Sequence, residues 1–236
     1  ATFSTTVDKI IEFAPDRLSV FNYAHLPERF MPQRRIGSED LPAPEAKLKI
    51  LHNTVDQLVA AEYRFIGMDH FAKPDDTLAK AQENGELHRN FQGYTTHGNC
   101  DLVAMGVSSI SMLDRTYYQN QYTIEDYESA ILKDQLPVIR GIELTDEDIL
   151  RRYVIGQLIC NFKLQPSHVE TMFDINFARH FATEMTELAD MAKDGLIKLN
   201  PDSIAVNPSG RLLIRGICKV FDQYRNDEQK SFSKII

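Results

Sequence analysis

Residues 88–112 read HRNFQGYTTHGNCDLVAMGVSSISM, and the rest of the chain can be interpreted outward from them. The first half mixes cationic, amide, aromatic and hydroxyl side chains without a helical or alternating period, which is typical of a loop. Residues 102–110 are apolar and rich in small side chains, which predicts a strand buried on both faces with a close backbone approach at Gly106. A polar loop that leads into a buried strand is a common way for α/β enzymes to present reactive groups, so we expect a functional site here.

The residues before this stretch predict alternating strands and helices. Residues 17–23 alternate and end in aromatic side chains, residues 45–61 carry apolar side chains on one helical face, and residues 63–68 are again strand-like. This order and spacing predict a βαβ unit with two parallel strands and a right-handed crossover.

A loop and a short helix are expected next. Residues 69–74 would form the loop at the end of the second strand. Asp69 and His70 in that loop could act as an acid/base pair, belong to a metal site or serve only a structural role. Residues 77–84 would be a helix that Asp75 or Asp76 caps and Gly85 ends.

From about residue 114 the pattern becomes mainly helical. Residues 117–122 are expected to form a polar, aromatic bridge and residues 137–141 a linker. Helices are predicted over residues 124–133, 145–162, 167–172 and 177–193, followed by a hairpin within residues 197–206 and a last helix after Pro208. This order is typical of a winged-helix-like domain. DNA binding is disfavoured, because residues 177–193 carry Glu184, Glu187 and Asp190 where a recognition helix needs lysine and arginine.

Composition narrows the class of protein. The chain has 236 residues, of which 43% are hydrophobic, and a formal net charge of −8. This charge argues against a general nucleic-acid or anionic-membrane binder, and no apolar run approaches the roughly 20 residues of a membrane span. The cysteines Cys100, Cys160 and Cys218 stand far apart, which favours reduced, buried thiols in a cytoplasmic protein over a disulfide framework.

Long strings in this sequence carry a resemblance to a known family. They are HRNFQGYTT, GVSSIS, SVFNYAHLP at 19–27, FIGMDHFAKPDD at 65–76 and RLLIR at 211–215. Together they span nearly the whole chain, which resembles the oxygen-independent coproporphyrinogen III dehydrogenases, radical S-adenosylmethionine enzymes of haem biosynthesis. The related haem chaperones carry a tryptophan-containing motif, and this chain has no tryptophan. A non-catalytic, haem-binding relative of that branch is the alternative function.

The resemblance implies a fold, a reaction and cofactors. Residues 1–120 would be the C-terminal strands of an incomplete, TIM-like (β/α) radical S-adenosylmethionine barrel, and residues 121–236 a mostly α-helical, winged-helix-like domain. The full-length enzyme would oxidatively decarboxylate coproporphyrinogen III to protoporphyrinogen IX, using a [4Fe–4S] cluster and S-adenosylmethionine. The substrate is thus an implied partner, whereas the electron donor stays open. The full-length protein is expected to be a monomer in the cytoplasm.

The sequence departs from the family at the cluster motif. The family holds its iron–sulfur cluster on a CxxxCxxC motif, and three widely spaced cysteines cannot form that loop. We therefore expect no metal ligands in this chain and interpret it as the C-terminal half of a longer enzyme, inactive alone. Its bare sheet edge should either cause self-association or be covered by the chain's own N-terminal residues. A zinc site built from His25, His70, His88 and His97 is disfavoured, because their spacing lacks compact pairs.

Site residues follow from the same resemblance. Phe91 and Gln92 are the candidate catalytic residues: the amide can donate and accept hydrogen bonds, and the ring offers a stacking face. Ala24 and Ile110 fall where the family contacts S-adenosylmethionine. Without the resemblance, Gln92 would be a loop amide and Ile110 a core residue. Arg29, Arg34 and Arg35 lie in a proline-rich excursion that is either solvated or meets a substrate propionate.

Overall fold

The computed structural model describes residues 2–98 and 100–225, and the chain divides into two compact units. Unit 1 comprises Ala1–Lys80 with Tyr224–Ile236, and unit 2 comprises residues 81–223. Each unit is described by itself. The predicted boundary between a barrel part and a C-terminal domain at residue 120 stays a prediction.

Unit 1 is a small antiparallel sheet with helices. Its elements are α1 (Thr2–Phe13), β1 (Arg17–Ser19), the 3-10 turns η1 (Met31–Arg35) and η2 (Ser38–Asp40), α2 (Pro44–Ala60), β2 (Arg64–Gly67), β3 (His70–Ala72) and the start of α3 (Thr77–Asn84). The strand order is β1-β3-β2, with both pairings antiparallel. Phe71 and Ala72 of the central strand are fully buried, together with Ile66 and Leu58.

The direct pairing predicted between the two strands of unit 1 is wrong, although β1 and β2 do run parallel to each other, because both are antiparallel to the strand between them. Residues 69–74 were expected to be a loop, but Met68 adopts a positive φ of 53° and the chain turns back at once, with Gly67 opposite His70. The new strand β3 then inserts between β1 and β2, because it supplies Phe71 and Ala72 to the core. The strand predicted over residues 17–23 ends at Ser19, and Phe21 beyond it is 70% exposed.

The helices predicted over residues 45–61 and 77–84 are confirmed within a few residues. Helix α2 begins at Pro44, where a proline costs no intrahelical hydrogen bond. At α3, the Asp76 carboxylate accepts a hydrogen bond from the backbone N–H of Leu78 at 2.7 Å, and Gly85 leaves the helix with a φ of 74°.

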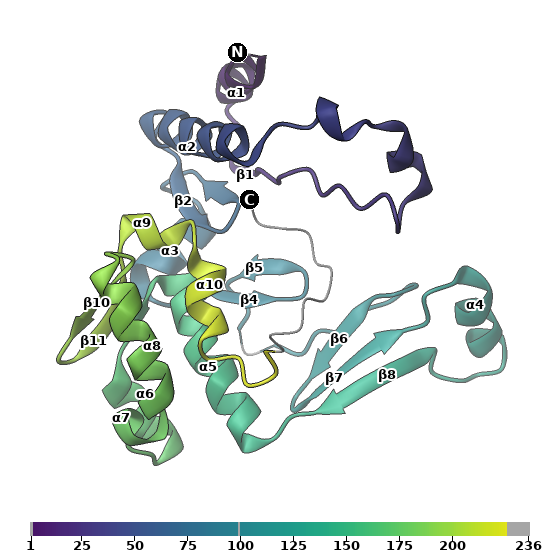
Figure 1. Cartoon of the computed structure of the whole chain (residues 1–236). Coiled ribbons are helices and arrows are strands. Elements are labelled where there is room, and N and C mark those ends of the chain that lie inside the picture. Colours follow the sequence, from purple (N-terminus) through teal and green to yellow (C-terminus); the bar gives the residue numbers. More distant parts are fainter. Residues whose placement is uncertain (1, 99, 226–236) are drawn as a thin grey trace. The chain divides into compact units, whose positions relative to one another are not determined.

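Unit 2 begins with two antiparallel sheets, visible in Figure 1. Strands β4 (His88–Asn90) and β5 (Gly93–Thr95) form a hairpin. Strands β6 (Ile110–Leu113), β7 (Thr116–Asn120) and β8 (Val138–Glu143) form a sheet, and α4 (Ile124–Leu132) lies between β7 and β8 in the chain. The helix predicted over residues 124–133 is confirmed, and Thr123 caps it, since its hydroxyl accepts from the backbone N–H of Asp126. The predicted linker at 137–141 is instead part of β8, whose backbone completes the ladder of β7.

The buried strand predicted over residues 102–110 is also wrong. Gly106 and Ser108 have positive φ values of 98° and 57°, which interrupt an extended strand. Val103 and Met105 are 64% and 85% exposed, and a Cβ at Gly106 would meet nothing within 4 Å, so no close backbone approach exists there. Isolated backbone bonds and side chains hold this segment instead: the Ser108 N–H donates to the carbonyl of Gln121 at 2.7 Å, and Asn120 Nδ2 donates to the carbonyl of Gly106 at 3.0 Å. Regular pairing of β6 with β7 begins only at Ile110.

The C-terminal part of unit 2 has the helices and hairpin predicted for it. Its elements are α5 (Asp146–Asn161), β9 (Lys163–Leu164), α6 (Pro166–Phe173), α7 (Phe177–His180), α8 (Ala182–Lys193), β10 (Ile197–Asn200), β11 (Ser203–Val206), α9 (Pro208–Arg211) and α10 (Ile214–Lys219). The strand order is β10-β11-β9, all antiparallel. The one long helix predicted over residues 177–193 is broken at Phe181, whose ring is fully buried between Phe177 and Phe221. The chain is thus of mixed α/β class, with a winged-helix-like order of elements at its C-terminal end.

Helix α5 is the central support of this part. A capping box fixes its start: the Thr145 hydroxyl accepts from the backbone N–H of Asp148, and the Asp148 carboxylate accepts from the backbone N–H of Thr145. One turn on, the Arg151 guanidinium donates to Glu147 at 2.6 Å and to Glu184 of α8 at 2.9 Å. Leu150, Val154 and Leu158 form its buried face.

Candidate active site

The β4–β5 hairpin presents Phe91 and Gln92 at its tip. Asn90 lies opposite Gly93, so these two residues are the whole connection between the strands. The Asn90 side-chain oxygen accepts a hydrogen bond from the backbone N–H of Gln92 at 2.9 Å, and Gly93 takes a φ of 128° that side chains rarely adopt. The loop predicted over this segment is therefore a hairpin whose turn is fixed by Asn90 and Gly93.

The two candidate catalytic side chains differ in how they are held. The Phe91 ring is 50% exposed and meets the Tyr117 ring edge to face, with centroids 5.3 Å apart and an interplanar angle of 88°. The Tyr117 hydroxyl in turn accepts a hydrogen bond from Arg152 of α5 at 3.1 Å. No described residue hydrogen-bonds to the exposed side-chain amide of Gln92, which leaves it available to a ligand.

Ile110 and Ala24 lie in different units. Ile110 is the first residue of β6, pairs with Gln119 and is half-buried. Ala24 lies in the loop after β1, where its carbonyl accepts a hydrogen bond from the Gln33 side chain at 3.0 Å. The structure thus brings Phe91 and Gln92 together within one turn, whereas Ala24 belongs to unit 1. The assignment of these four residues stays a prediction.

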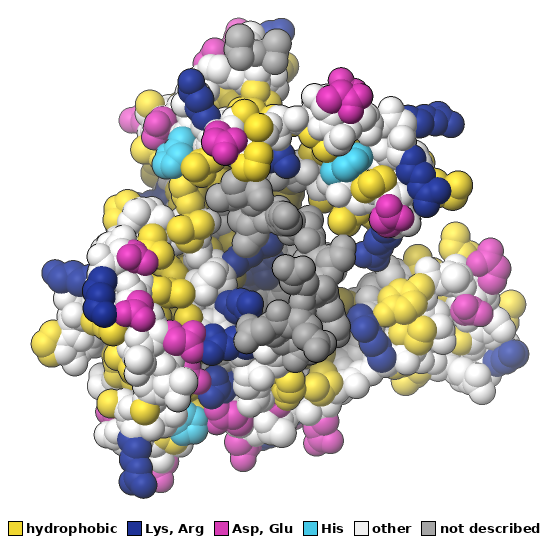
Figure 2. All heavy atoms as spheres, in the orientation of Figure 1, with side chains coloured by type: hydrophobic (Ala, Val, Ile, Leu, Met, Phe, Trp, Pro, Cys, Tyr) yellow, Lys and Arg dark blue, Asp and Glu magenta, His cyan; other side chains and the backbone are white. Residues whose placement is uncertain are grey.

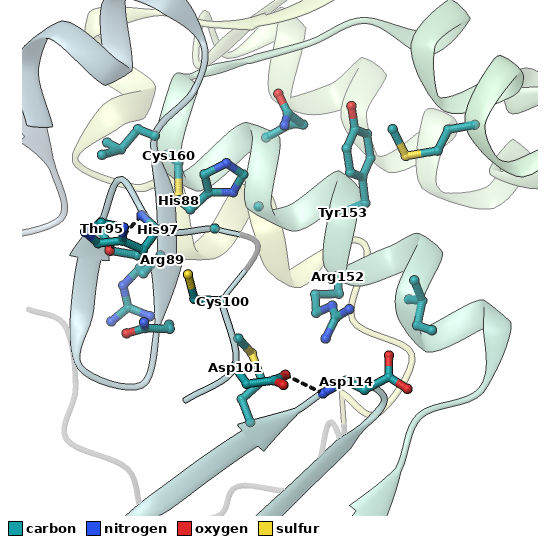
Figure 3. A pocket seen from close by; sticks show the side chains of 18 of the residues that line it. His88, Arg89, Thr95, His97, Cys100, Asp101, Asp114, Arg152, Tyr153 and Cys160 are labelled. Atoms are coloured by element: carbon teal, nitrogen blue, oxygen red, sulfur yellow. Dashed lines mark hydrogen bonds between the residues drawn. The ribbon is translucent and has the colours of Figure 1, made fainter. Parts of the chain in front are cut away.

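A cavity of about 630 Å³ opens beside this hairpin, within unit 2 (Figure 3). Four segments form its wall: the β4–β5 hairpin, the residues that follow it, the β6–β7 turn and one face of α5 with the end of α6. Its lining residues are Leu87, His88, Arg89, Asn90, Thr95, His97, Gly98, Cys100, Asp101, Met112, Asp114, Ile149, Arg152, Tyr153, Gly156, Gln157, Cys160, Met172 and Phe173. Pockets that hold small molecules are typically about 300–1,000 Å³, so this one is large enough for a ligand.

Local geometry explains why these segments enclose a space. The α5 residues that line the cavity recur every three or four positions, so they share one face of the helix. The hairpin is tied to the end of that helix, because the Asn161 side chain accepts from the Leu87 backbone N–H at 3.3 Å and donates to its carbonyl at 3.4 Å. Gly98 lies against the His88 ring so closely that a Cβ there would overlap it. Gly156 faces open space, since a Cβ at this position would meet nothing within 4 Å.

The cavity wall carries balanced charge. Arg89 and Arg152 contribute guanidinium groups, whereas Asp101 and Asp114 contribute carboxylates. Figure 3 shows the two aspartates beside each other, where the backbone N–H of Asp114 donates to the Asp101 side chain at 2.8 Å. No carboxylate among the described residues lies within ion-pair distance of Arg89 or Arg152. The wall therefore offers both strong donors and strong acceptors that are not neutralised by each other.

Burial sets the protonation of two groups at this wall. It raises the pKa of the Cys160 thiol to about 12, while the charge of Arg89 acts in the opposite direction. It also raises the pKa of the Tyr153 phenol. Both groups are therefore neutral near pH 7 and would act only as weak hydrogen-bonding partners.

The described cysteines do not fit an iron–sulfur cluster. Cluster ligands are thiolates, but burial raises the pKa of Cys218 to about 12 as well, with Cys160 adding to the effect, and Cys100 is exposed and alone. Over residues 2–98 and 100–225, no cluster of three or more potential metal-ligating side chains from His, Cys, Asp and Glu occurs. In the same ranges, no helix has the length and apolar character of a membrane span.

Asp69 and His70 form a pair in unit 1. His70 Nδ1 lies 2.7 Å from the Asp69 carboxylate, in the turn that joins β2 to β3, and the His70 ring meets Phe21 edge to face at 6.0 Å. This geometry suits an acid/base pair and equally a hydrogen bond that only stabilises the turn, so the role of Asp69 and His70 stays open.

Sequence reasoning missed several residues of the cavity wall. Arg152, Gly156 and Asp114 were assigned no role, although the spacing of Arg152 and Gly156 already places them on one helical face. Tyr117, treated as part of a bridge, contacts both Phe91 and Arg152. A polar stripe along one face of the predicted helix 145–162 is the signal that could have indicated a cavity.

Comparisons with known proteins point to one family. A family model described as the HemN C-terminal domain matches residues 144–213. An oxygen-independent coproporphyrinogen III oxidase of Pseudomonas aeruginosa is 54% identical over 236 residues, covering 100% of this chain and 51% of that protein. Another, of Thermostichus vulcanus, is 44% identical over 237 residues, covering 100% of this chain and 73% of that protein.

A solved structure is similar as well. It is described as "Coproporphyrinogen III oxidase (HemN) from Escherichia coli is a Radical SAM enzyme", and it matches with a TM-score of 0.92 at 52% identity. The match covers 94% of this chain and 51% of that one, so this chain spans about half the length of that enzyme and of the Pseudomonas relative. These three relatives carry the oxidase name, and nothing in them favours the haem-chaperone alternative.

Proposed function

The chain belongs to the oxygen-independent coproporphyrinogen III oxidase family, and on this premise we propose that it forms one half of an enzyme converting coproporphyrinogen III to protoporphyrinogen IX in haem biosynthesis. The observation that carries this proposal is the similarity to the Pseudomonas aeruginosa oxidase, which is 54% identical over 100% of this chain. We place the complete enzyme in the cytoplasm, and its electron donor stays open.

The proposed reaction divides between this chain and the rest of the enzyme. A radical S-adenosylmethionine enzyme needs a [4Fe–4S] cluster, which supplies the electron that cleaves S-adenosylmethionine and so starts hydrogen abstraction from the substrate. The three thiols of this chain do not fit that cluster, so its ligands would come from outside these residues. The role we assign to this chain is to bind and orient S-adenosylmethionine and the substrate.

Gln92 and Phe91 are the residues that we expect to do this work. The Gln92 amide is exposed at a turn whose backbone is already fixed by Asn90, so its donor and acceptor are available to a ligand head group. Phe91 offers the exposed half of a ring that Tyr117 holds in place. Ile110 and Ala24 are proposed to contact S-adenosylmethionine through apolar packing and backbone, respectively.

A chimera tests the proposal. The segment of the Pseudomonas aeruginosa relative that matches this chain is replaced by the chain itself, and protoporphyrinogen IX formation and S-adenosylmethionine cleavage are measured without oxygen. We expect product formation within about tenfold of the parent enzyme, and a loss of about ten- to a hundredfold on Gln92→Ala, as for a hydrogen bond to a charged ligand group. A chimera that folds and holds its cluster but forms no product would show that the proposed function is wrong.

A further inference from the structure

The cavity beside the β4–β5 hairpin has a chemical composition that selects a particular class of ligand. Its two guanidinium groups, on Arg89 and Arg152, are strong donors to carboxylates. Its two carboxylates, on Asp101 and Asp114, are acceptors only. Because the formal charges balance, a simple anion gains little net attraction, and the best ligand presents carboxylates and N–H donors together.

The two arginines come from different elements. Arg89 is on β4 and Arg152 is on α5, and Figure 3 shows them on separate parts of the wall. Arg152 is held by its hydrogen bond to the Tyr117 hydroxyl at 3.1 Å, which leaves its other N–H groups free to donate. Arg89 lies over the Tyr94 ring, with its guanidinium carbon 5.9 Å from the ring centroid. Each guanidinium can therefore receive its own carboxylate, which suits a ligand with several such groups.

The cavity floor leaves room for the ligand body. Gly156 lies in the middle of α5, where glycine is less favourable than alanine, and no atom lies within 4 Å of the position that a Cβ would take. Nothing in the helix packing therefore requires glycine there. Met112, Met172 and Phe173 add apolar lining, which is suited to a ring system.

We propose that this cavity is the binding site of the porphyrinogen substrate, with Arg89 and Arg152 each meeting a carboxylate side chain and Asp101 and Asp114 accepting pyrrole N–H groups. This inference rests on the proposed function, because a porphyrinogen carries carboxylates around its rim and N–H groups at its centre. It adds the residues that would hold the carboxylates and N–H groups of the substrate, beyond the contacts that the proposed function assigns to Phe91 and Gln92.

Binding to the chain itself tests the inference without requiring turnover. Coproporphyrinogen III is titrated into the 236-residue chain by calorimetry under anaerobic conditions. We expect saturable binding, and a dissociation constant about ten- to a hundredfold higher for Arg89→Gln and for Arg152→Gln. Arg179→Gln is the matched control, since Arg179 is an exposed arginine on α7 outside the cavity, and its dissociation constant should not change.

Two further binding measurements test the free space at Gly156 and the role of Asp101 and Asp114. Gly156→Leu fills the cavity and should abolish binding, whereas Gly156→Ala should keep the fold and most of the affinity; thermal unfolding of both variants verifies folding. Mellitate, a ring with carboxylates but no N–H group, should bind at least about tenfold more weakly than coproporphyrinogen III if the aspartates contribute a hydrogen bond of ordinary strength.

The outcomes separate this inference from the proposed function. Binding that is absent, or that folded Arg89→Gln, Arg152→Gln and Gly156→Leu variants leave unchanged, would overturn the cavity assignment. Equal affinity for mellitate would overturn the role of the aspartates. Product formation by the chimera would stand in any of these cases, and loss of that activity with normal binding would refute the proposed function alone.

Discussion

Phe91 and Gln92 are neighbours in one turn, but their replacement by alanine should have different effects on stability. Phe91→Ala removes an edge-to-face contact with Tyr117, worth roughly 0.5–1.5 kcal/mol. It also removes the half of the ring that is buried in the folded chain, and this lost apolar burial is worth about 1 kcal/mol. We therefore expect a loss of about 1.5–2.5 kcal/mol in the free energy of unfolding. Gln92→Ala removes a side chain that makes no hydrogen bond to any described residue, so its effect should stay within about 0.5 kcal/mol.

The assay pairs stability with activity. For a chain of this size, 1 kcal/mol corresponds to roughly 2–4 °C in thermal midpoint, so Phe91→Ala should lower it by about 3–10 °C and Gln92→Ala by less than about 2 °C. In the chimera, both variants should lose at least about tenfold in turnover if both side chains contact a ligand. A double-mutant cycle of Phe91→Ala with Tyr117→Ala should give a coupling energy of about 0.5–1.5 kcal/mol.

Two results would contradict this reasoning. If Gln92→Ala lowers the thermal midpoint as much as Phe91→Ala does and keeps its specific activity, the turn is architectural and Gln92 has no catalytic role. If the double-mutant cycle gives no coupling, the ring contact does not position Phe91.

Three further properties can be checked on the chain alone. Asp148 is buried and accepts hydrogen bonds from the Thr145 backbone N–H at 2.9 Å and from Gln223 Nε2 at 2.6 Å, so Asp148→Ala should cost about 2–4 kcal/mol in urea unfolding; a cost below about 1 kcal/mol would contradict this role. The pKa values of Cys160 and Cys218 lie near 12, above the ordinary value of 9.0, so burial of the neutral thiols stabilises the fold fully below pH 9.0, and this stabilisation should be lost as pH rises toward 12. A thiol reagent at pH 8 should therefore label Cys100 alone in the native chain, and fast labelling of all three cysteines would refute this. The chain should also self-associate, because β1 forms a sheet edge and because Leu132 and Leu136, between β7 and β8 in the chain, are 86% and 82% exposed. Figure 2 shows hydrophobic side chains at the surface of this part of unit 2. A monodisperse monomer by light scattering would count against self-association.

Local sequence alone predicted the elements whose causes are local. The helix that Thr123 caps, the helix that Thr145 and Asp148 open, and the turn at Gly85 were all predicted, because a capping hydroxyl or a left-handed glycine needs only the residues beside it. The family also followed from sequence, through long strings such as HRNFQGYTT, and so did the lack of a local cysteine cluster motif.

Tertiary structure decided what depends on partners far along the chain. The strand β3 forms because Phe71 and Ala72 are buried and because β1, much earlier in the chain, pairs with its free edge. Strand β8 forms because β7 offers it a ladder. In both cases the pairing partner lies outside the strand's own residues. The cavity is of the same kind. Arg89 and Arg152 become two donors of one wall only because Asn161 ties the hairpin to α5 and Tyr117 holds the second arginine, and such side-chain contacts between distant segments leave no periodic pattern in the sequence.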